Sequence, residues 1–142
     1  MTTSARTAGA DAPGRSRSAV FSAFAGLTAL VVLLQGVWAG LFVPTAKGGP
    51  YNDTWVGVHS MGALLALLLA LVTTVIGVVR LRPRRELWIG AGVLSLLLIL
   101  EMILGGLVSD GGSRAAAVVH IPLALVIMAV TVWLPLRARQ VT

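Results

Sequence analysis

Four long apolar runs constrain the fold of this chain more than any other feature. Each run exceeds twenty residues and contains at most one Asp or Glu; the runs are 20–43, 55–79, 87–108 and 115–136. At about 1.5 Å per residue, a helix of this length crosses the roughly 30 Å hydrocarbon core of a bilayer. Backbone groups in lipid must be hydrogen-bonded within their own segment, so each run is expected to be a helix. We predict an all-α integral membrane protein, with one antiparallel four-helix bundle over residues 20–137.

Composition excludes a soluble globular domain. Hydrophobic residues make up 57% of the chain and charged residues 11%, and the mean hydropathy is +0.93. A soluble domain has about a quarter of its residues charged. The sequence contains no cysteine, which excludes disulfides, iron–sulfur clusters, thiolate zinc sites and cysteine nucleophiles. Few side chains remain that could carry chemistry, and His59 and His120 are the two histidines.

The arginines lie on one side of the predicted spans. They gather before the first run, between the second and third runs and after the fourth, whereas the other two connections contain only Lys47 and Arg114 as cations. Cytoplasmic flanks carry the excess of Lys and Arg, so both termini are predicted to be cytoplasmic, with tails over 1–19, expected to be disordered, and 138–142. This asymmetry accounts for the net charge of +6 without a nucleic-acid partner. A signal-peptide core is about 7–15 residues, shorter than the first run, so we expect a retained helix.

The two halves of the chain resemble each other. In each half a polar residue, Gln35 or Glu101, lies in the helix that leads to an outer loop with Gly and Asp, and a Val-His pair follows in the returning helix. The pattern predicts two helical-hairpin repeats. Membrane proteins built from repeats often place a binding site where the repeats meet.

His59 and His120 are predicted to lie at the same depth. His59 is the fifth residue of its run and His120 the sixth, which places both about 6–8 Å below the same membrane boundary. In a ring of four helices the second and fourth are diagonal, roughly 12–14 Å apart for neighbours separated by 8–10 Å. That gap is too wide for direct contact but suits two imidazoles on opposite faces of a haem. We therefore expect both histidines to be metal ligands of a b-type haem.

Four further polar residues are candidates for the haem pocket. Glu101 is the one carboxylate inside a run; it could accept a hydrogen bond from a ligating imidazole, carry a proton, line a substrate site, or be a protonated acid bonded to a neighbouring helix. Gln35 is its counterpart in the first half, expected to support a histidine or to join two helices. Lys47 and Arg114 could neutralise outward-pointing propionates or be ordinary loop charges.

Small residues surround the histidines in the sequence. Gly62 and Ala63 follow His59, and Ala124 follows His120. They would leave room for a porphyrin ring, but small residues also let helices approach closely without any ligand. Either histidine alone could equally contact water or a loop carbonyl. Zinc is a poorer candidate, because it needs three or four ligands close together and no HxxxH or HxxE spacing occurs. The tryptophans near the run ends are typical of the membrane interface; they are Trp38, Trp55, Trp88 and Trp133.

Two segments resemble helix pairs of the heme A synthase family. The first is 35–40 with Gly48-Gly49 and Val58-His59, and the second is 101–106 with 119–124. The resemblance implies one four-helix half of that architecture, whose second and fourth helices carry paired histidines that bind haem. The chain also resembles small four-helix proteins of unknown function from high-GC bacteria, which implies a bacterial cytoplasmic membrane.

The chain departs from that family at its catalytic positions. Val56 and Gly57 stand where the family's catalytic half has a glutamate before its first histidine, and the chain has neither the loop cysteine pair nor a second histidine pair. Heme A synthesis is therefore not expected. What the resemblance implies here is haem b ligation by His59 and His120.

The leading functional prediction is a b-type haem protein that transfers electrons or handles haem near the outer membrane face. The first alternative is a non-enzymatic structural protein or a subunit of a larger membrane complex. The second is a small, dimeric, proton-coupled transporter with Glu101 as its coupling carboxylate. The expected partners are the bilayer and, depending on the interpretation, a redox protein, a membrane complex or a second copy of the chain.

Overall fold

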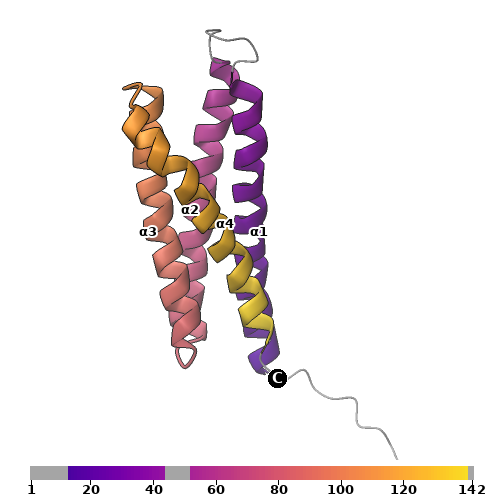
Figure 1. Cartoon of the computed structure of the whole chain (residues 1–142). Helices are drawn as coiled ribbons and strands as arrows, with labels where there is room; N and C mark the ends of the chain where they lie inside the picture. Colours follow the sequence, from indigo (N-terminus) through magenta and orange to yellow (C-terminus); the bar gives the residue numbers. More distant parts are fainter. Residues whose placement is uncertain (1–12, 44–51, 141–142) are drawn as a thin grey trace, which may run out of the picture.

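The computed structural model describes residues 13–43 and 52–140. Regular structure in these ranges is entirely helical, in four helices: α1 (Pro13–Phe42), α2 (Asp53–Arg80), α3 (Arg85–Ser109) and α4 (Arg114–Arg139) (Figure 1). All four are long and apolar enough to cross a membrane, with mean hydropathies between 2.1 and 2.6. The predictions of an all-helical chain and of four apolar, membrane-length segments are confirmed, as expected of a multi-pass membrane protein.

Polar side chains cap the first turns of α2 and α4. The Asn52 side chain accepts a hydrogen bond from the Trp55 N–H at 3.3 Å, and the Ser113 hydroxyl accepts one from the Ala116 N–H at 3.2 Å. Each cap satisfies a backbone N–H that has no partner inside the first turn of its helix. Helix α1 begins at Pro13 rather than at residue 20. Proline is favoured at a first helical position, where its missing N–H costs nothing.

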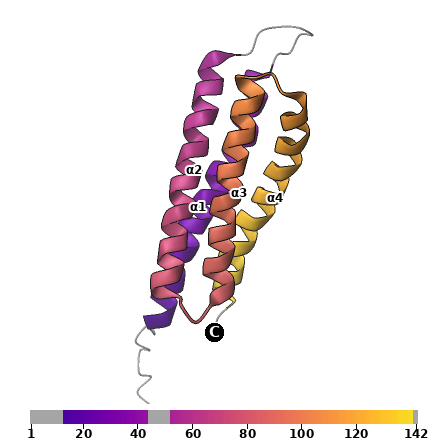
Figure 2. The ribbon, with the colours of Figure 1, turned by 90° about the vertical axis from the view of Figure 1, so that its left-hand side faces the viewer.

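Each helix packs against two others. The packed pairs are α1–α2, α2–α3, α3–α4 and α1–α4, whereas no Cα atoms of α2 and α4 come within 8 Å of each other in the described ranges. Figures 1 and 2 show the α2–α3 turn and the C-terminus of α4 at one end of the molecule, and the α3–α4 turn with the start of α2 at the other. The diagonal helices α2 and α4 are therefore separated across the ring.

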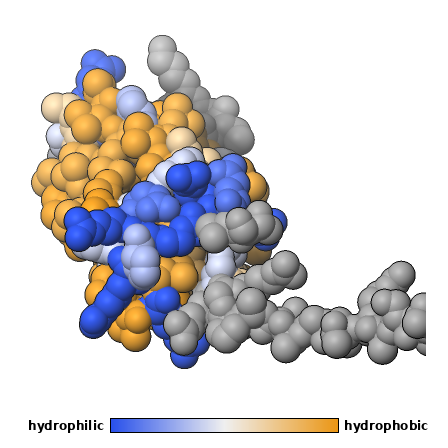
Figure 3. Space-filling view, turned by 90° about the horizontal axis from the view of Figure 1, so that it is seen from below, coloured by the Kyte–Doolittle hydropathy of each residue, from blue (hydrophilic) through white to orange (hydrophobic). Residues whose placement is uncertain are grey.

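The two ends of the molecule differ in character. We call one the arginine-rich end; its residues are Arg80, Arg82, Arg84, Arg85, Arg137 and Arg139. Figure 3 views this end, where hydrophilic side chains gather and apolar sides surround them. We call the other the histidine end, because it contains His59 and His120. Between the two ends large apolar side chains are exposed, including Met61 and Leu96 at 68% each, a surface suited to lipid rather than water.

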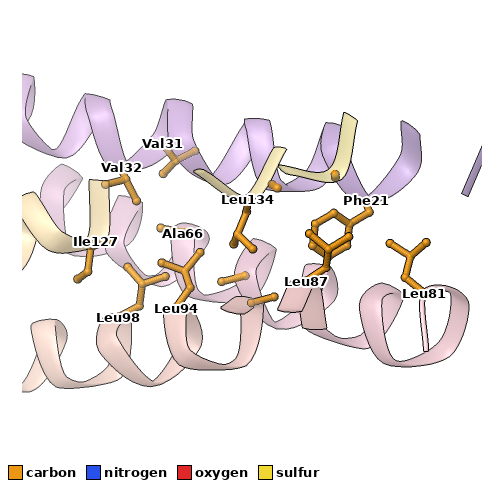
Figure 4. Close-up of a cluster of buried hydrophobic side chains, with 14 residues drawn as sticks. Phe21, Val31, Val32, Ala66, Leu81, Leu87, Leu94, Leu98, Ile127 and Leu134 are labelled. Carbon is orange, nitrogen blue, oxygen red and sulfur yellow. The ribbon is translucent and has the colours of Figure 1, made fainter. Parts of the chain in front are cut away.

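The core is concentrated nearer the arginine-rich end. Phe21, Leu87 and Leu134 are fully buried there, with further buried residues up to Val32 in α1 and Leu98 in α3 (Figure 4). Beyond these two positions neither helix has another buried residue in the described ranges. In α2 and α4 the histidine end contributes one buried residue each, Gly62 and Ala116. The histidine end is therefore the loosely packed half.

Buried hydroxyls in the core bond within their own helices. Thr28, Thr73 and Thr131 have no exposed surface, and each hydroxyl donates to a carbonyl three or four residues earlier at 2.8 to 2.9 Å. One contact crosses between helices, since the Thr74 hydroxyl of α2 lies 3.2 Å from the Ser95 hydroxyl of α3. These hydrogen bonds satisfy the threonine hydroxyls at the helix contacts, whereas the buried Ser22 hydroxyl has no partner in the described ranges.

Arg84 fastens the end of α4 at the arginine-rich end. Its guanidinium donates to the carbonyl of Arg137 at 3.0 Å and to that of Ala138 at 3.2 Å. It also lies 3.2 Å from a carboxylate oxygen of Glu86. The Ser18 hydroxyl of α1 donates to the same Ala138 carbonyl at 2.6 Å. The last carbonyls of α4 thus receive donors from the α2–α3 turn and from α1.

Candidate functional site

The histidine end brings together one polar side chain from each helix. These are Gln35 of α1, His59 of α2, Glu101 of α3 and His120 of α4, all partly buried. The side chains of Glu101 and His120 are 14% and 22% exposed. His59 lies close enough to both Glu101 and His120 to interact with them electrostatically. The sequence placed these four residues at similar depth, and they lie in the loosely packed half of the molecule.

The hairpin of α3 and α4 pairs its two polar residues. Nδ1 of His120 lies 3.1 Å from Oε1 of Glu101, although the two groups are not aligned as a linear hydrogen bond. The second oxygen, Oε2, is buried and has no hydrogen-bond partner within the described ranges. The His120 ring also lies against Gly105, where an added Cβ would stand 3.3 Å from Cε1. Glu101 and the bare backbone at Gly105 therefore set the position of the imidazole.

The hairpin of α1 and α2 pairs its residues in a similar way. Nδ1 of His59 lies 3.2 Å from the backbone oxygen of Gln35. With its nitrogen turned toward α2, the Gln35 amide donates to the His59 carbonyl at 2.8 Å and to Nδ1 of His59 at 3.0 Å, and it accepts from the Ala63 N–H at 3.2 Å. Phe42 stands edge-on to the His59 ring, with ring centroids 5.3 Å apart. The His59 ring is thus held between a helix carbonyl and an aromatic side chain.

Both imidazoles present Nδ1 to an acceptor from their own hairpin. The Gln35 backbone carbonyl accepts from Nδ1 of His59 only when the proton sits on Nδ1, whereas the Gln35 amide donates to Nδ1 only in the other tautomer. A carboxylate oxygen favours the tautomer with the proton on Nδ1 in His120. In neither ring does Nε2 have a hydrogen-bond partner in the part of the chain that the structure describes. In the tautomer with the proton on Nδ1, each ring would keep a free lone pair on Nε2, the arrangement common among metal-binding histidines.

The small residues play different parts. A Cβ added at Gly62 would collide with the Trp38 ring and with the Gln35 amide, so these side chains fill the space beside Gly62. Trp38 thus packs between α1 and α2, although its position near a run end is typical of the membrane interface. Ala63 contributes its backbone N–H to Gln35. Ala124, one turn beyond His120, is half-buried.

No hydrogen bond or ion pair joins Arg114 to either histidine in the described part of the chain. Arg114 is the first residue of α4 and is exposed at the histidine end. Lys47 lies outside the described residues. In the described ranges no group of three or more His, Cys, Asp or Glu side chains is placed to hold a metal ion. The donor set available at this end is therefore a pair of imidazoles, which suits a metal that brings its own equatorial ligands.

An open apolar groove of about 710 Å³ lies on the outside of α1 and α2. Trp38 and α2 residues between Thr54 and Leu68 line it, and neither histidine does. It is separate from the polar group at the histidine end.

Sequence reasoning did not find two residues that shape the site. Phe42 was the apolar end of a run, and its contact with His59 depends on how the α1–α2 connection returns. Gly105 lies in a segment that the sequence linked only to a family resemblance, and its contact with His120 depends on the rotation of α3 and α4. Compared with protein-family models, with curated proteins and with solved structures, the chain gives no match.

Proposed function

We propose that this chain is a multi-pass protein of the bacterial cytoplasmic membrane that binds one b-type haem between His59 and His120. The four helices form an antiparallel bundle of two hairpin repeats. The arginine-rich end and both termini lie in the cytoplasm, because Lys and Arg are concentrated at that end. The haem lies toward the outer face and serves electron transfer or haem handling.

One observation supports this proposal most strongly. Each histidine directs Nδ1 toward an acceptor supplied by its own hairpin, Gln35 for His59 and Glu101 for His120. The two free Nε2 atoms belong to helices on opposite sides of the ring. With their Nδ1 atoms in these contacts, His59 and His120 would be the residues that hold the iron of a b-type haem.

The surroundings fit a flat, apolar group. No Cα atoms of α2 and α4 approach within 8 Å in the described ranges, so the diagonal is not closed by helix contact. The histidine end has few buried residues, whereas the other half is densely packed. A macrocycle placed there would supply the apolar contacts that this half lacks.

The roles of the individual residues follow from their positions. His59 and His120 hold the iron, and Gln35 and Glu101 fix the orientation of their rings. Phe42 and Gly105 limit ring movement from the side. Arg114 and Lys47 are the cations available to the haem propionates. The three small residues near the histidines, Gly62, Ala63 and Ala124, add little side-chain bulk. When bound, the haem supplies one-electron redox chemistry.

An absorption spectrum tests the proposal. The full chain is expressed with ample haem, purified in mild detergent, and measured oxidised and reduced. We expect a six-coordinate low-spin b-haem spectrum that is lost in His59→Ala and in His120→Ala. Ser60→Ala is the matched control, because Ser60 is exposed beside His59 and its hydroxyl donates only to its own helix; this variant retains the spectrum. Wild-type protein that purifies without haem would rule the proposal out.

A further inference from the structure

The two hairpins present chemically unequal partners to their histidines. Behind His59 stands the neutral backbone carbonyl of Gln35 at 3.2 Å, beside the neutral amide of the same residue. Behind His120 stands a carboxyl oxygen of Glu101 at 3.1 Å. Each histidine places Nδ1 about 3 Å from a residue of its own hairpin, but the contact in the first hairpin is to neutral groups and only the second involves a carboxyl group.

Among the residues that the structure describes, no cationic side chain other than His120 lies within ion-pair distance of Glu101. In the described ranges the other ion pair joins Arg84 and Glu86 at the opposite end of α3. The Glu101 side chain is only 14% exposed, and its Oε2 atom is buried without a hydrogen-bond partner. A partly buried carboxylate is costly unless it has a positive partner. The partner available to Glu101 is the imidazole of His120.

We propose that Glu101 is a positioning and tuning residue that makes the two axial ligands unequal and favours the oxidised form of the bound haem. This inference rests on the proposed haem site and adds its electronic regulation. A ferric b-type haem has a net positive charge at its centre, which ligation shares with the His120 ring, and reduction removes that charge. A carboxylate 3.1 Å behind the ring is stabilised by the positive charge and loses that partner on reduction.

Gln35, the neutral counterpart of Glu101 in the first hairpin, allows the effect of a carboxylate on the haem potential to be tested at the other histidine. Its side-chain amide lies 3.0 Å from Nδ1 of His59, so its substitution by Glu would place a carboxylate oxygen beside the other ligand. Replacing Glu101 by Gln makes the second hairpin resemble the first. Each change preserves the length of the side chain and nearly its shape, so the charge is what differs.

The experiment compares reduction potentials of the haem-loaded full-length protein by spectroelectrochemical titration. We expect Glu101→Gln to raise the midpoint potential and Gln35→Glu to lower it. Each should change the ferric-to-ferrous equilibrium about tenfold, which for one electron is about 59 mV. Glu86→Gln is the matched control, because it removes a carboxylate from the same helix about 22 Å away; its potential stays at the wild-type value. The low-spin ferric EPR spectrum should shift in the first two variants and remain unchanged in the control.

The outcomes separate this inference from the haem proposal. Haem-loaded Glu101→Gln protein with an unchanged potential overturns the role of Glu101 and leaves the haem site intact. Wild-type protein without haem overturns both. If Glu101→Gln does not retain haem, Gln35→Glu decides, and a potential that fails to fall in that variant overturns the inference.

Discussion

The imidazole of His120 lies against Gly105, so closely that a Cβ at Gly105 would stand 3.3 Å from Cε1 of the ring. Gly106, the next residue, would place its Cβ where no atom lies within 4 Å. The two neighbouring glycines therefore differ in what a methyl group would meet, which allows a matched comparison.

We expect Gly105→Ala to weaken haem binding. The methyl group pushes the His120 ring away from the position set by Glu101, at a cost of about 1 kcal/mol, or a roughly fivefold loss of haem affinity. Gly106→Ala leaves the affinity unchanged, because its methyl group points into open space. Haem-to-protein ratios after titration with haemin check this, and equal affinities in the two variants would contradict it.

Gly62→Ala should destabilise the contact between α1 and α2. The added methyl group collides with Trp38 and with the amide of Gln35, so one of these side chains must move, at a cost of about 1–3 kcal/mol. Gly57→Ala on the same helix is the control, since nothing lies within 4 Å of its Cβ. Thermal unfolding followed by circular dichroism in detergent measures both. A Gly62→Ala protein that melts at or above the Gly57→Ala temperature would argue against this packing.

Arg84→Ala should loosen the end of α4. The substitution removes the donors that reach the carbonyls of Arg137 and Ala138, and charged hydrogen bonds of this kind contribute about 1.5–3 kcal/mol each when shielded. The Arg84 side chain is 18% exposed, so we expect a total loss of about 1–2 kcal/mol. Arg80→Ala removes the same charge from an exposed position and should cost little. Hydrogen exchange at the C-terminal turn of α4 reports the difference, and equal protection in both variants would exclude the proposed fastening.

Leu94→Ala should be far more damaging than Leu96→Ala. Leu94 is 1% exposed in the core, and Leu96 is 68% exposed on the same helix. Truncating the buried leucine leaves a cavity and costs about 2–4 kcal/mol, whereas the outer leucine only exchanges one apolar contact with detergent or lipid for another. Denaturation in detergent measures the two changes, and similar losses would mean that the outer face of α3 is covered by protein.

The sequence predicted the parts of the structure that depend on local pattern. The apolar runs located four helices, because membrane-length apolar segments have few other conformations. The internal repeat linked Gln35 with Glu101 and His59 with His120. The structure joins the members of each hairpin, Gln35 to His59 and Glu101 to His120.

The sequence could not predict how the helices are rotated. They are apolar on nearly every face, so no polar stripe indicates which side turns inward. For that reason the insertion of Trp38 beside Gly62 and the contact of Gly105 with His120 had no signature in the pattern. The role of Arg84 was hidden for another reason, because arginines at this end were already explained by membrane orientation.

Most buried side chains lie in one half of the molecule, so the residues that stabilise the fold are largely separate from the polar residues of the histidine end. Cohesion comes from the half that contains Phe21, Leu87 and Leu134, and the chemistry-bearing side chains lie in the other. The histidine end is therefore less constrained by packing than the arginine-rich end. Truncating a side chain there should cost less stability than truncating one of the buried residues of the other half.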